Sequence, residues 1–246
     1  MISVCMATYN GERFIREQID SILSQLSDED ELVISDDGST DKTLEIIDSY
    51  KDGRIKVFHH ERNSNYKRIR RNKSFYYVTS NFENALKQAK GDFIFLSDQD
   101  DVWVDGKKKV MLEKIGDAEL AMCNLSVIDE NGNVKIKRRY EKSPIPTSFL
   151  AKIYCSKHMG CCMLLKRSLL KKILPFPKML IAQDFWIGLL ADSFVFVQEP
   201  LQLYRRHSGN VSPATHKSPN PLWYKIFYRL VILRLVLKRK AEIKRK

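Results

Sequence analysis

The sequence predicts an α/β fold built on a mostly parallel sheet with helices on both faces. Between Ile2 and Leu96, short apolar runs alternate with stretches whose apolar residues recur at helical spacing. Polar clusters directly follow three of the apolar runs, which is where parallel strands place a ligand site. The 246 residues, 43% of them apolar, suffice for one large domain or two small ones, each with a sizeable core.

The elements of the first half can be placed from their periodicity. The apolar run 2–7 predicts a first strand, and Phe14 to Leu26 predict an amphipathic helix packed on the sheet. Thr40 or Asp41 is expected to cap a second helix. The remaining elements are strands at 32–34, 55–58 and 93–96 and a helix at 81–90.

From about Glu119 the alternation weakens. Apolar runs at 120–122, 160–165 and 194–197 are separated by polar and proline-bearing segments, which indicates a mixed second half rather than further βαβ units. Two segments rich in Lys and Arg, 65–73 and 135–142, are expected to be solvated loops, with binding of a phosphate or an anionic acceptor as the alternative.

Most of the surplus positive charge lies at the C-terminus. The whole chain has a formal charge of +12, and residues 222–246 contain nine basic side chains and one acidic. Charges interrupt the apolar residues of this tail every few positions, so it is not expected to span a bilayer. An amphipathic helix on an anionic membrane surface is expected, and docking on the core or on a second subunit of a homodimer is the alternative.

Cysteine usage and the N-terminus indicate the cytoplasm. The five cysteines show no C-x-x-C spacing, and they are expected to be reduced and mostly buried. No basic segment followed by a long apolar run begins the sequence, so no secretory signal is expected.

The carboxylates Asp98, Asp100 and Asp101 follow the strand at 93–96. Three carboxylates within four residues repel one another unless a cation or ligand hydroxyls compensate them. Oxygen ligands of this kind suit Mg²⁺ or Mn²⁺, with a substrate diphosphate completing the coordination. The preceding buried strand and the following Trp103 strengthen this interpretation of an otherwise weak D-x-D pattern.

A second acidic pair, Asp36 and Asp37, precedes Gly38 and Ser39. These residue types are typical of a turn and a helix cap. Their position at the end of the strand 32–34, beside the loop with Tyr9, favours a binding role: a carboxylate can accept a hydrogen bond from N3–H of a pyrimidine while Tyr9 packs on the ring.

Three stretches, 2–11, 33–41 and 91–103, resemble in this order the motifs of family 2 glycosyltransferases of the GT-A fold. The residues 97–103 resemble most the rhamnosyl- and hexosyltransferase branch. The resemblance extends to about residue 210. It implies a GT-A domain at 1–220, with a nucleotide-sugar-binding half (1–103) and an acceptor half (104–220), followed by the basic tail at 221–246.

The resemblance also implies roles for individual residues. Those that would contact the nucleotide sugar are Thr8, Tyr9, Glu12, Asp37 or less favourably Asp36, Asp98 and Gly160. Those that would bind the metal are Asp98, Asp100 and His207. Those that would contact the acceptor or the diphosphate are Asp101, Trp103, Trp186 and Arg205. Asp184 would be the catalytic base and must then lie opposite the metal, while a helix cap for Asp184 and a surface position for His207 are the alternatives.

The implied activity is inverting and metal-dependent, with Mg²⁺ or Mn²⁺. A sugar would pass from dTDP-rhamnose or a UDP-hexose to a hydroxyl of a growing, lipid-linked polysaccharide, at the inner face of the cell membrane. The competing hypothesis is a nucleic-acid-binding protein that uses the basic tail. Because no RNP, KH, zinc-finger or helix-turn-helix pattern is present, no nucleic-acid partner is expected.

Overall fold

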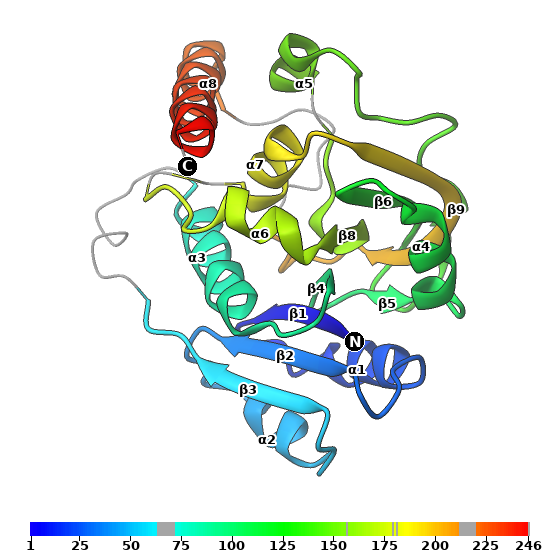
Figure 1. The fold of residues 1–246 in the computed structure, drawn as a ribbon. Helices are drawn as coiled ribbons and strands as arrows, with labels where there is room; N and C mark the ends of the chain where they lie inside the picture. Colours follow the sequence, from blue (N-terminus) through cyan, green and yellow to red (C-terminus); the bar gives the residue numbers. More distant parts are fainter. Residues whose placement is uncertain (63–71, 156, 179, 181, 212–219, 246) are drawn as a thin grey trace.

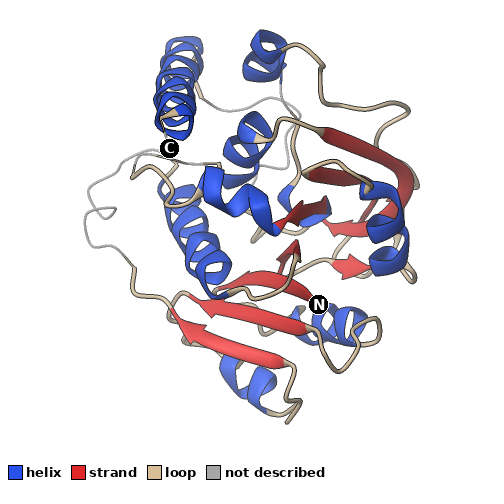
Figure 2. Cartoon of the chain, in the orientation of Figure 1, coloured by secondary structure: helices blue, strands red, loops and turns tan. Residues whose placement is uncertain are grey.

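The computed structural model describes residues 1–246 except 63–71, 156, 179, 181, 212–219 and 246. It is a mixed α/β structure in which helices surround a curled central sheet (Figures 1 and 2). The strands are β1 (Ile2–Thr8), β2 (Glu31–Asp36), β3 (Ile55–His59), β4 (Phe93–Asp98), β5 (Val102–Trp103), β6 (Leu120–Ile128), β7 (Val134–Ile136), β8 (Met163–Lys166) and β9 (Phe194–Arg205). The helices are α1 (Ile15–Leu23), α2 (Thr43–Asp48), α3 (Lys73–Gln88), α4 (Lys107–Ile115), α5 (Phe149–Cys155), α6 (Arg167–Ile173), α7 (Gln183–Leu190) and α8 (Leu222–Lys244).

The first half of the sheet is parallel, as the sequence predicts. The strand order begins β3-β2-β1-β4, and every pair in this set runs in the same direction. The register places Thr8 opposite Asp36 and Ala7 opposite Asp98. Helix α3 packs on β1 and β2, and Figure 1 shows α1 and α2 on the other side of these strands. The carboxyl ends of β1, β2 and β4 therefore meet at one edge of the sheet.

Buried amide side chains fix these carboxyl ends. Asn81 of α3 donates from Nδ2 to the carbonyl oxygen of Thr8 at 3.1 Å. Gln18 of α1 donates from Nε2 to Ser97 Oγ at 2.7 Å and to the carbonyl oxygen of Asp98 at 2.9 Å. These bonds satisfy backbone carbonyls where the ladder ends, so the strand ends are held from both faces.

The second half is mixed, which confirms the expectation from the weaker periodicity. The order continues β8-β6-β9-β5; β8 is antiparallel to β4 and β6, β6 is parallel to β9, and β5 is antiparallel to β9. One sheet thus runs through both halves. Gly91 allows the close approach that precedes β4, because a Cβ atom there would lie 2.4 Å from the backbone nitrogen of Ser3.

Three local predictions differ from the structure. Helix α3 begins at Lys73, eight residues before the expected start at Asn81. Residues 160–162 form a 3₁₀ turn, so the strand expected from Gly160 begins only at Met163. Helix α2 begins at Thr43, so Lys42 holds the cap position that was expected for Thr40 or Asp41. Asp41 still accepts a hydrogen bond from the Thr43 backbone nitrogen at 3.0 Å.

The basic segments and the cysteines can be followed only in part. Residues 65–71 of the first basic segment lie outside the described residues, and the segment 135–142 is largely exposed, as expected for a solvated loop. The cysteines Cys5, Cys123, Cys161 and Cys162 are free and buried, which confirms the expectation for these four. The side chain of Cys155 lies outside the described part of the chain.

The C-terminal helix α8 packs against α5 and α7 with one of its faces. Ile232 and Val236 are fully buried there. Arg239 donates to the carbonyl oxygens of Lys172 at 3.1 Å, Leu174 at 2.9 Å and Pro175 at 2.6 Å. Docking on the core, one of the two expectations for the tail, is therefore present for this face. In the part of the chain that the structure describes, we find no helix that combines the length and the apolar character needed to cross a membrane.

The anchoring role of Arg239 can be tested by substitution. Arg239→Ala removes three charged hydrogen bonds to carbonyls, and we expect the free energy of unfolding to fall by about 2 kcal/mol. Arg234→Ala is the matched control, because Arg234 is an exposed arginine of the same helix, and its effect should stay within about 0.5 kcal/mol. Urea denaturation measures both, and equal stabilities of the two variants would contradict this docking of α8.

Candidate active site

A cavity of about 630 Å³ opens at the carboxyl ends of β1, β2 and β4. It is bounded by α3, by the start of α7 and by the segment that follows β9. Eight of the residues expected in the site line it: Thr8, Tyr9, Asp37, Asp98, Asp100, Gly160, Asp184 and His207. The structure therefore brings together residues from six separate parts of the chain.

The two neighbouring aspartates after β2 have different surroundings. Asp36 is fully buried, and its carboxylate accepts hydrogen bonds from Thr8 Oγ1 at 2.9 Å and from the backbone nitrogens of Gly38 and Ser39 at 3.0 and 2.8 Å. These bonds connect Asp36 to β1 and to the turn after β2, so its carboxylate stabilises this turn. Asp37 lines the cavity instead, so it is the one of the two carboxylates that borders the space open to a ligand.

Tyr9 and its neighbours form the same end of the cavity. The backbone of Tyr9 is clamped by Gln99, whose Oε1 accepts from the Tyr9 nitrogen at 2.9 Å and whose Nε2 donates to the Tyr9 carbonyl at 3.0 Å. The Asp37 carboxylate pairs with His60 Nδ1 at 2.8 Å and with Arg62 Nε at 2.5 Å. The backbone of Tyr9 is thus fixed beside the end of the cavity where Asp37 pairs with a histidine and an arginine.

Asp100 and His207 meet in the middle of the cavity. His207 Nε2 lies 2.8 Å from Asp100 Oδ2, and Asn210 donates from Nδ2 to the same oxygen at 3.0 Å. Asn210 also accepts from the His207 backbone nitrogen at 2.8 Å, so one turn fixes both partners of the carboxylate. The segment after β9 therefore closes over the aspartates that follow β4.

Burial and neighbouring negative charge perturb the acids of the cavity. Burial, followed by the charges of Asp100 and Asp184, raises the pKa of Asp98 to about 7. Burial raises the pKa of Asp184 to about 6, against the effect of hydrogen bonds from backbone groups. The main cause in both cases is removal of the carboxylate from water, and the neighbouring carboxylates add to it for Asp98.

The residues present fit a divalent cation. Asp100 and His207 offer a carboxylate and an imidazole on the cavity wall. The carboxylate of Asp98 lines the same cavity, but its ligand atoms do not lie within 4.8 Å of both of them, so binding one ion with all three requires a side-chain movement. His207 Nε2 and Asp100 Oδ2 already lie within 2.8 Å, close enough to share one ion. Oxygen-rich donor sets with one imidazole suit Mn²⁺ or Mg²⁺.

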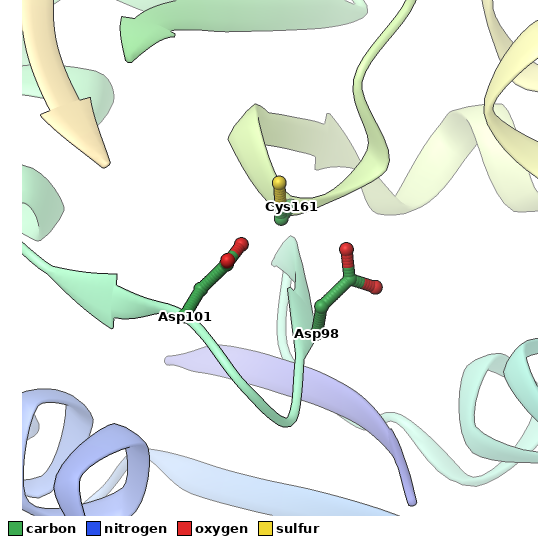
Figure 3. Close-up of side chains that lie close together, drawn as sticks. All are labelled: Asp98, Asp101 and Cys161. Carbon is green, nitrogen blue, oxygen red and sulfur yellow. The ribbon is translucent and has the colours of Figure 1, made fainter. Parts of the chain in front are cut away.

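A second acidic group lies behind this wall. Figure 3 shows the carboxylates of Asp98 and Asp101 beside the thiol of Cys161, and one ligand atom from each of the three lies within 4.8 Å of the others. Asp101 is fully buried, and burial with the charges of Asp100 and Asp98 raises its pKa well above the usual range. The buried ammonium of Lys107 donates to the Cys161 carbonyl at 2.9 Å. Asp101 and Cys161 do not line the cavity.

Asp184 and Gly160 form the other end of the cavity. Asp184 lies in the first turn of α7, not at its cap, and its Oδ1 accepts from the Phe185 nitrogen at 2.7 Å. A Cβ atom on Gly160 would lie 3.7 Å from the Cβ of Asp184, an ordinary van der Waals contact, so Gly160 adjoins this aspartate. Gln183 lines the same region and is fixed by Thr79 Oγ1, 3.1 Å from its Oε1.

Six of the residues expected in the site do not line the cavity. Asp36 and Asp101 are described above, and the other four are Trp103, Trp186, Glu12 and Arg205. Trp103 and Trp186 are buried core residues: Trp103 packs on Phe95 with 4.9 Å between ring centroids, and the indole nitrogen of Trp186 donates to a backbone carbonyl. The expectation that they contact acceptor or diphosphate is wrong, because a preceding motif does not determine which way an aromatic ring turns.

Glu12 and Arg205 hold loops in place, as Asp36 does, and do not line the cavity. Glu12 accepts from the Lys42 backbone nitrogen at 2.9 Å and connects two loops. Arg205 is buried, and its Nε donates to the Asp100 carbonyl while its backbone nitrogen donates to Asp101 Oδ1, both at 2.9 Å. These residues shape the loops that carry the site without reaching the cavity.

Several residues of the site were missed from the sequence. Gln99, Arg62, Asn210 and Gln183 line the cavity and bond to its other residues, and His60 is a partner of Asp37. Gln99 stands inside the D-x-D motif and could have been found from that position. The others follow β3 or β9 or begin α7, and nothing local marks them as partners of residues far away in the chain.

Comparisons with known proteins agree with this geometry. Residues 3–174 match the family model described as glycosyl transferase family 2. The chain is 26% identical to the putative teichuronic acid biosynthesis glycosyltransferase TuaG of Bacillus subtilis, over 91% of this chain and 86% of that protein. It is 29% identical to the GalNAc(5)-diNAcBac-PP-undecaprenol beta-1,3-glucosyltransferase of Campylobacter jejuni, over 54% of this chain and 40% of that protein.

A solved structure shares the fold. S. aureus TarS in complex with UDP-GlcNAc matches with a TM-score of 0.68 and 23% identity, over 94% of this chain and 66% of that one. The chain spans 64% and 50% of the length of two further curated relatives, so it corresponds to about half to two thirds of those proteins. The family match covers most of the chain and includes the strands that form the cavity edge. The chain belongs to glycosyl transferase family 2 and has the GT-A type of fold.

Proposed function

We propose that this chain is an inverting, metal-dependent glycosyltransferase that uses a pyrimidine nucleotide sugar. The observation that carries the proposal is the arrangement of one cavity. The strands β2, β1, β4 and β8 lie in this order in the sheet, and the cavity residues Asp37, Tyr9, Asp98 and Gly160 stand at their ends in the same order. Asp184 lies beside Gly160, and His207 beside Asp100. A nucleotide sugar needs, in this linear order, a site for its nucleobase, a site for its diphosphate and a group that takes the proton from the acceptor hydroxyl.

The donor is a UDP-hexose or dTDP-rhamnose. Its pyrimidine packs on Tyr9 while N3–H donates to Asp37, and Thr8 lies beside this end of the cavity. Asp98 faces the ribose and diphosphate. The complex of TarS with UDP-GlcNAc, a protein of the same fold, supports a uridine nucleotide. Rhamnose remains the alternative sugar, from the form of residues 97–103.

Asp184 acts on the acceptor. The acceptor oxygen attacks the anomeric carbon, the bond from that carbon to the diphosphate oxygen breaks, and the acceptor proton passes to the Asp184 carboxylate. A pKa of about 6 makes this carboxylate a better base than an ordinary one while leaving it mostly ionised at neutral pH. Mn²⁺ or Mg²⁺ on Asp98, Asp100 and His207 would neutralise charge that develops on the departing diphosphate.

The acceptor is a growing, lipid-linked polysaccharide. The Campylobacter relative is named for an undecaprenol-linked acceptor and the Bacillus relative for teichuronic acid synthesis, and both names support such a substrate. We assign residues 1–220 to catalysis and 221–246 to a position at the cytoplasmic face of the membrane.

Helix α8 has a surface suited to an anionic bilayer. Trp223, Phe227 and Leu230 are exposed on it, and Tyr154 of the adjoining α5 is exposed as well. Large apolar side chains on a strongly basic helix suit the interface of anionic lipids, where the rings enter the boundary of the acyl chains and the cations meet the headgroups. The buried face around Val236 then holds the body of the enzyme to this surface.

The metal assignment is tested with Asp100→Asn. We expect Mn²⁺ to raise the melting temperature of the unaltered protein, because an ion that binds only the folded state stabilises that state. We expect this shift to be lost in the variant. Transfer activity should fall by about 100-fold or more. Asp105→Asn, an exposed acid of the next loop, is the control and should keep both properties. A full Mn²⁺ shift in Asp100→Asn would exclude Asp100 as a ligand.

The role of Asp184 is tested with Asp184→Asn. We expect the turnover number to fall by about 10² to 10⁴ while donor affinity stays unchanged, because only the proton acceptor is lost. In the unaltered enzyme, turnover should rise with pH and be half-maximal near pH 6, since Asp184 must be ionised, and the residual activity of the variant should lack this dependence. Asp192→Asn, beyond the end of α7, is the control. A variant with normal turnover would show that another group takes the proton.

The membrane assignment is tested by sedimentation with lipid vesicles. The full chain should bind vesicles that contain phosphatidylglycerol, less at high salt, and not neutral vesicles. Replacing Trp223 and Phe227 together by Ser should reduce binding about tenfold or more. Replacing the exposed Val134 and Ile136 of β7 by Ser is the control. If binding persists in the first variant, or if that variant instead dissociates a dimer, the surface of α8 is not a lipid contact.

A further inference from the structure

The carboxylate assigned to the donor base already has partners within the chain. His60 Nδ1 lies 2.8 Å from Asp37 Oδ1, and Arg62 Nε lies 2.5 Å from Asp37 Oδ2. Each oxygen of the carboxylate therefore has a partner within the chain. A nucleobase that donates a hydrogen bond to Asp37 must therefore share the carboxylate with His60 or Arg62, or replace one of these two residues.

Arg62 also covers the aromatic ring assigned to the base. Its guanidinium carbon lies 3.5 Å from the centroid of the Tyr9 ring and 4.7 Å from that of Tyr77. Arg62, Tyr9, Tyr77 and Asp37 all line the cavity, and the Arg62 side chain is 30% exposed. The guanidinium is thus inside the base end of the cavity and not on the outer surface.

The guanidinium and a pyrimidine ring make the same two contacts. Both are planar, both present a face to an aromatic ring, and both carry an N–H group in the plane that a carboxylate can accept. A pyrimidine that packs on Tyr9 and donates to Asp37 would meet the guanidinium in the position it now has. We propose that Arg62 and the donor base compete for one subsite, so that Arg62 is displaced when the base binds. This inference rests on the proposed function, which places the base at Tyr9 and Asp37.

Displacement makes Arg62 a determinant of specificity. Displacing Arg62 breaks both its contact with the Tyr9 ring and its N–H bond to Asp37. A ligand that replaces only one of these contacts does not compensate for the loss of the other. A pyrimidine replaces both, whereas a free sugar or phosphate offers no aromatic face. The ion pair and the ring contact together correspond to about a tenfold effect on base affinity.

The test measures binding of uridine and thymidine by NMR titration. Neutral nucleosides are used because removing an arginine would also weaken attraction for a charged diphosphate. We expect Arg62→Ala to bind them about tenfold more tightly than the unaltered chain, and Arg62→Lys to be intermediate because its ammonium keeps the charge but lacks the planar face. Arg16→Ala is the matched control: the Arg16 guanidinium lies 5.7 Å from the ring centroid of Tyr50, outside the cavity, and its removal should change nothing.

Chemical complementation adds a readout that a change in loop structure would not produce. Guanidinium chloride at low millimolar concentration should weaken nucleoside binding to Arg62→Ala, because the free ion can return to Tyr9 and Asp37, and should hardly affect the unaltered chain. Sodium chloride at equal concentration is the control for ionic strength. Absence of this competition in Arg62→Ala would contradict the subsite.

The outcomes separate this inference from the proposed function. If Arg62→Ala binds uridine and thymidine equally well or more weakly than the unaltered chain does, Arg62 is a neighbour or a ligand of the base and the inference is wrong, while the nucleotide site stands. If neither protein binds these nucleosides, UDP or dTDP, the nucleotide site itself is wrong and the inference fails with it.

Discussion

Parallel pairing of β1 with β2 and β4 is the constraint on which the site depends. The register sets Thr8 opposite Asp36 and Ala7 opposite Asp98, so three strand ends deliver polar groups to one edge. A shift by one residue would turn these side chains to the opposite face of the sheet. Asp36, braced by Thr8 and by the turn, then leaves Asp37 facing the cavity.

The acids after β4 are divided between structure and ligand. Asp101 turns inward, where the backbone of Arg205 donates to it and where the buried ammonium of Lys107 supports the neighbouring loop. Asp98 faces the cavity and has a pKa raised to about 7 because it is buried near other carboxylates. Lys107 is buried and does not line the cavity. Asp98 and Asp100 do line it, and neighbouring carboxylates at such a position suit a divalent cation.

The sequence was sufficient for the parallel half of the fold and for the strand-end clusters, because periodicity and turn chemistry are local properties. It could not decide between Asp36 and Asp37 with certainty, since the choice depends on a hydrogen bond from Thr8, 28 residues away. It was wrong for Trp103 and Trp186, whose burial depends on packing against distant strands and loops. Arg62 gave no local signal, because its partners Tyr9 and Asp37 lie in other segments.

In the proposed enzyme, one cavity holds the nucleobase, then the diphosphate with the metal, and then Asp184. A crystal structure with Mn²⁺ and UDP or dTDP would show this arrangement, with anomalous scattering to locate the ion. We expect the pyrimidine at Tyr9 and Asp37, and Mn²⁺ between Asp100 and His207. Manganese bound instead to Asp101 and Cys161, or a nucleotide outside this cavity, would contradict this arrangement.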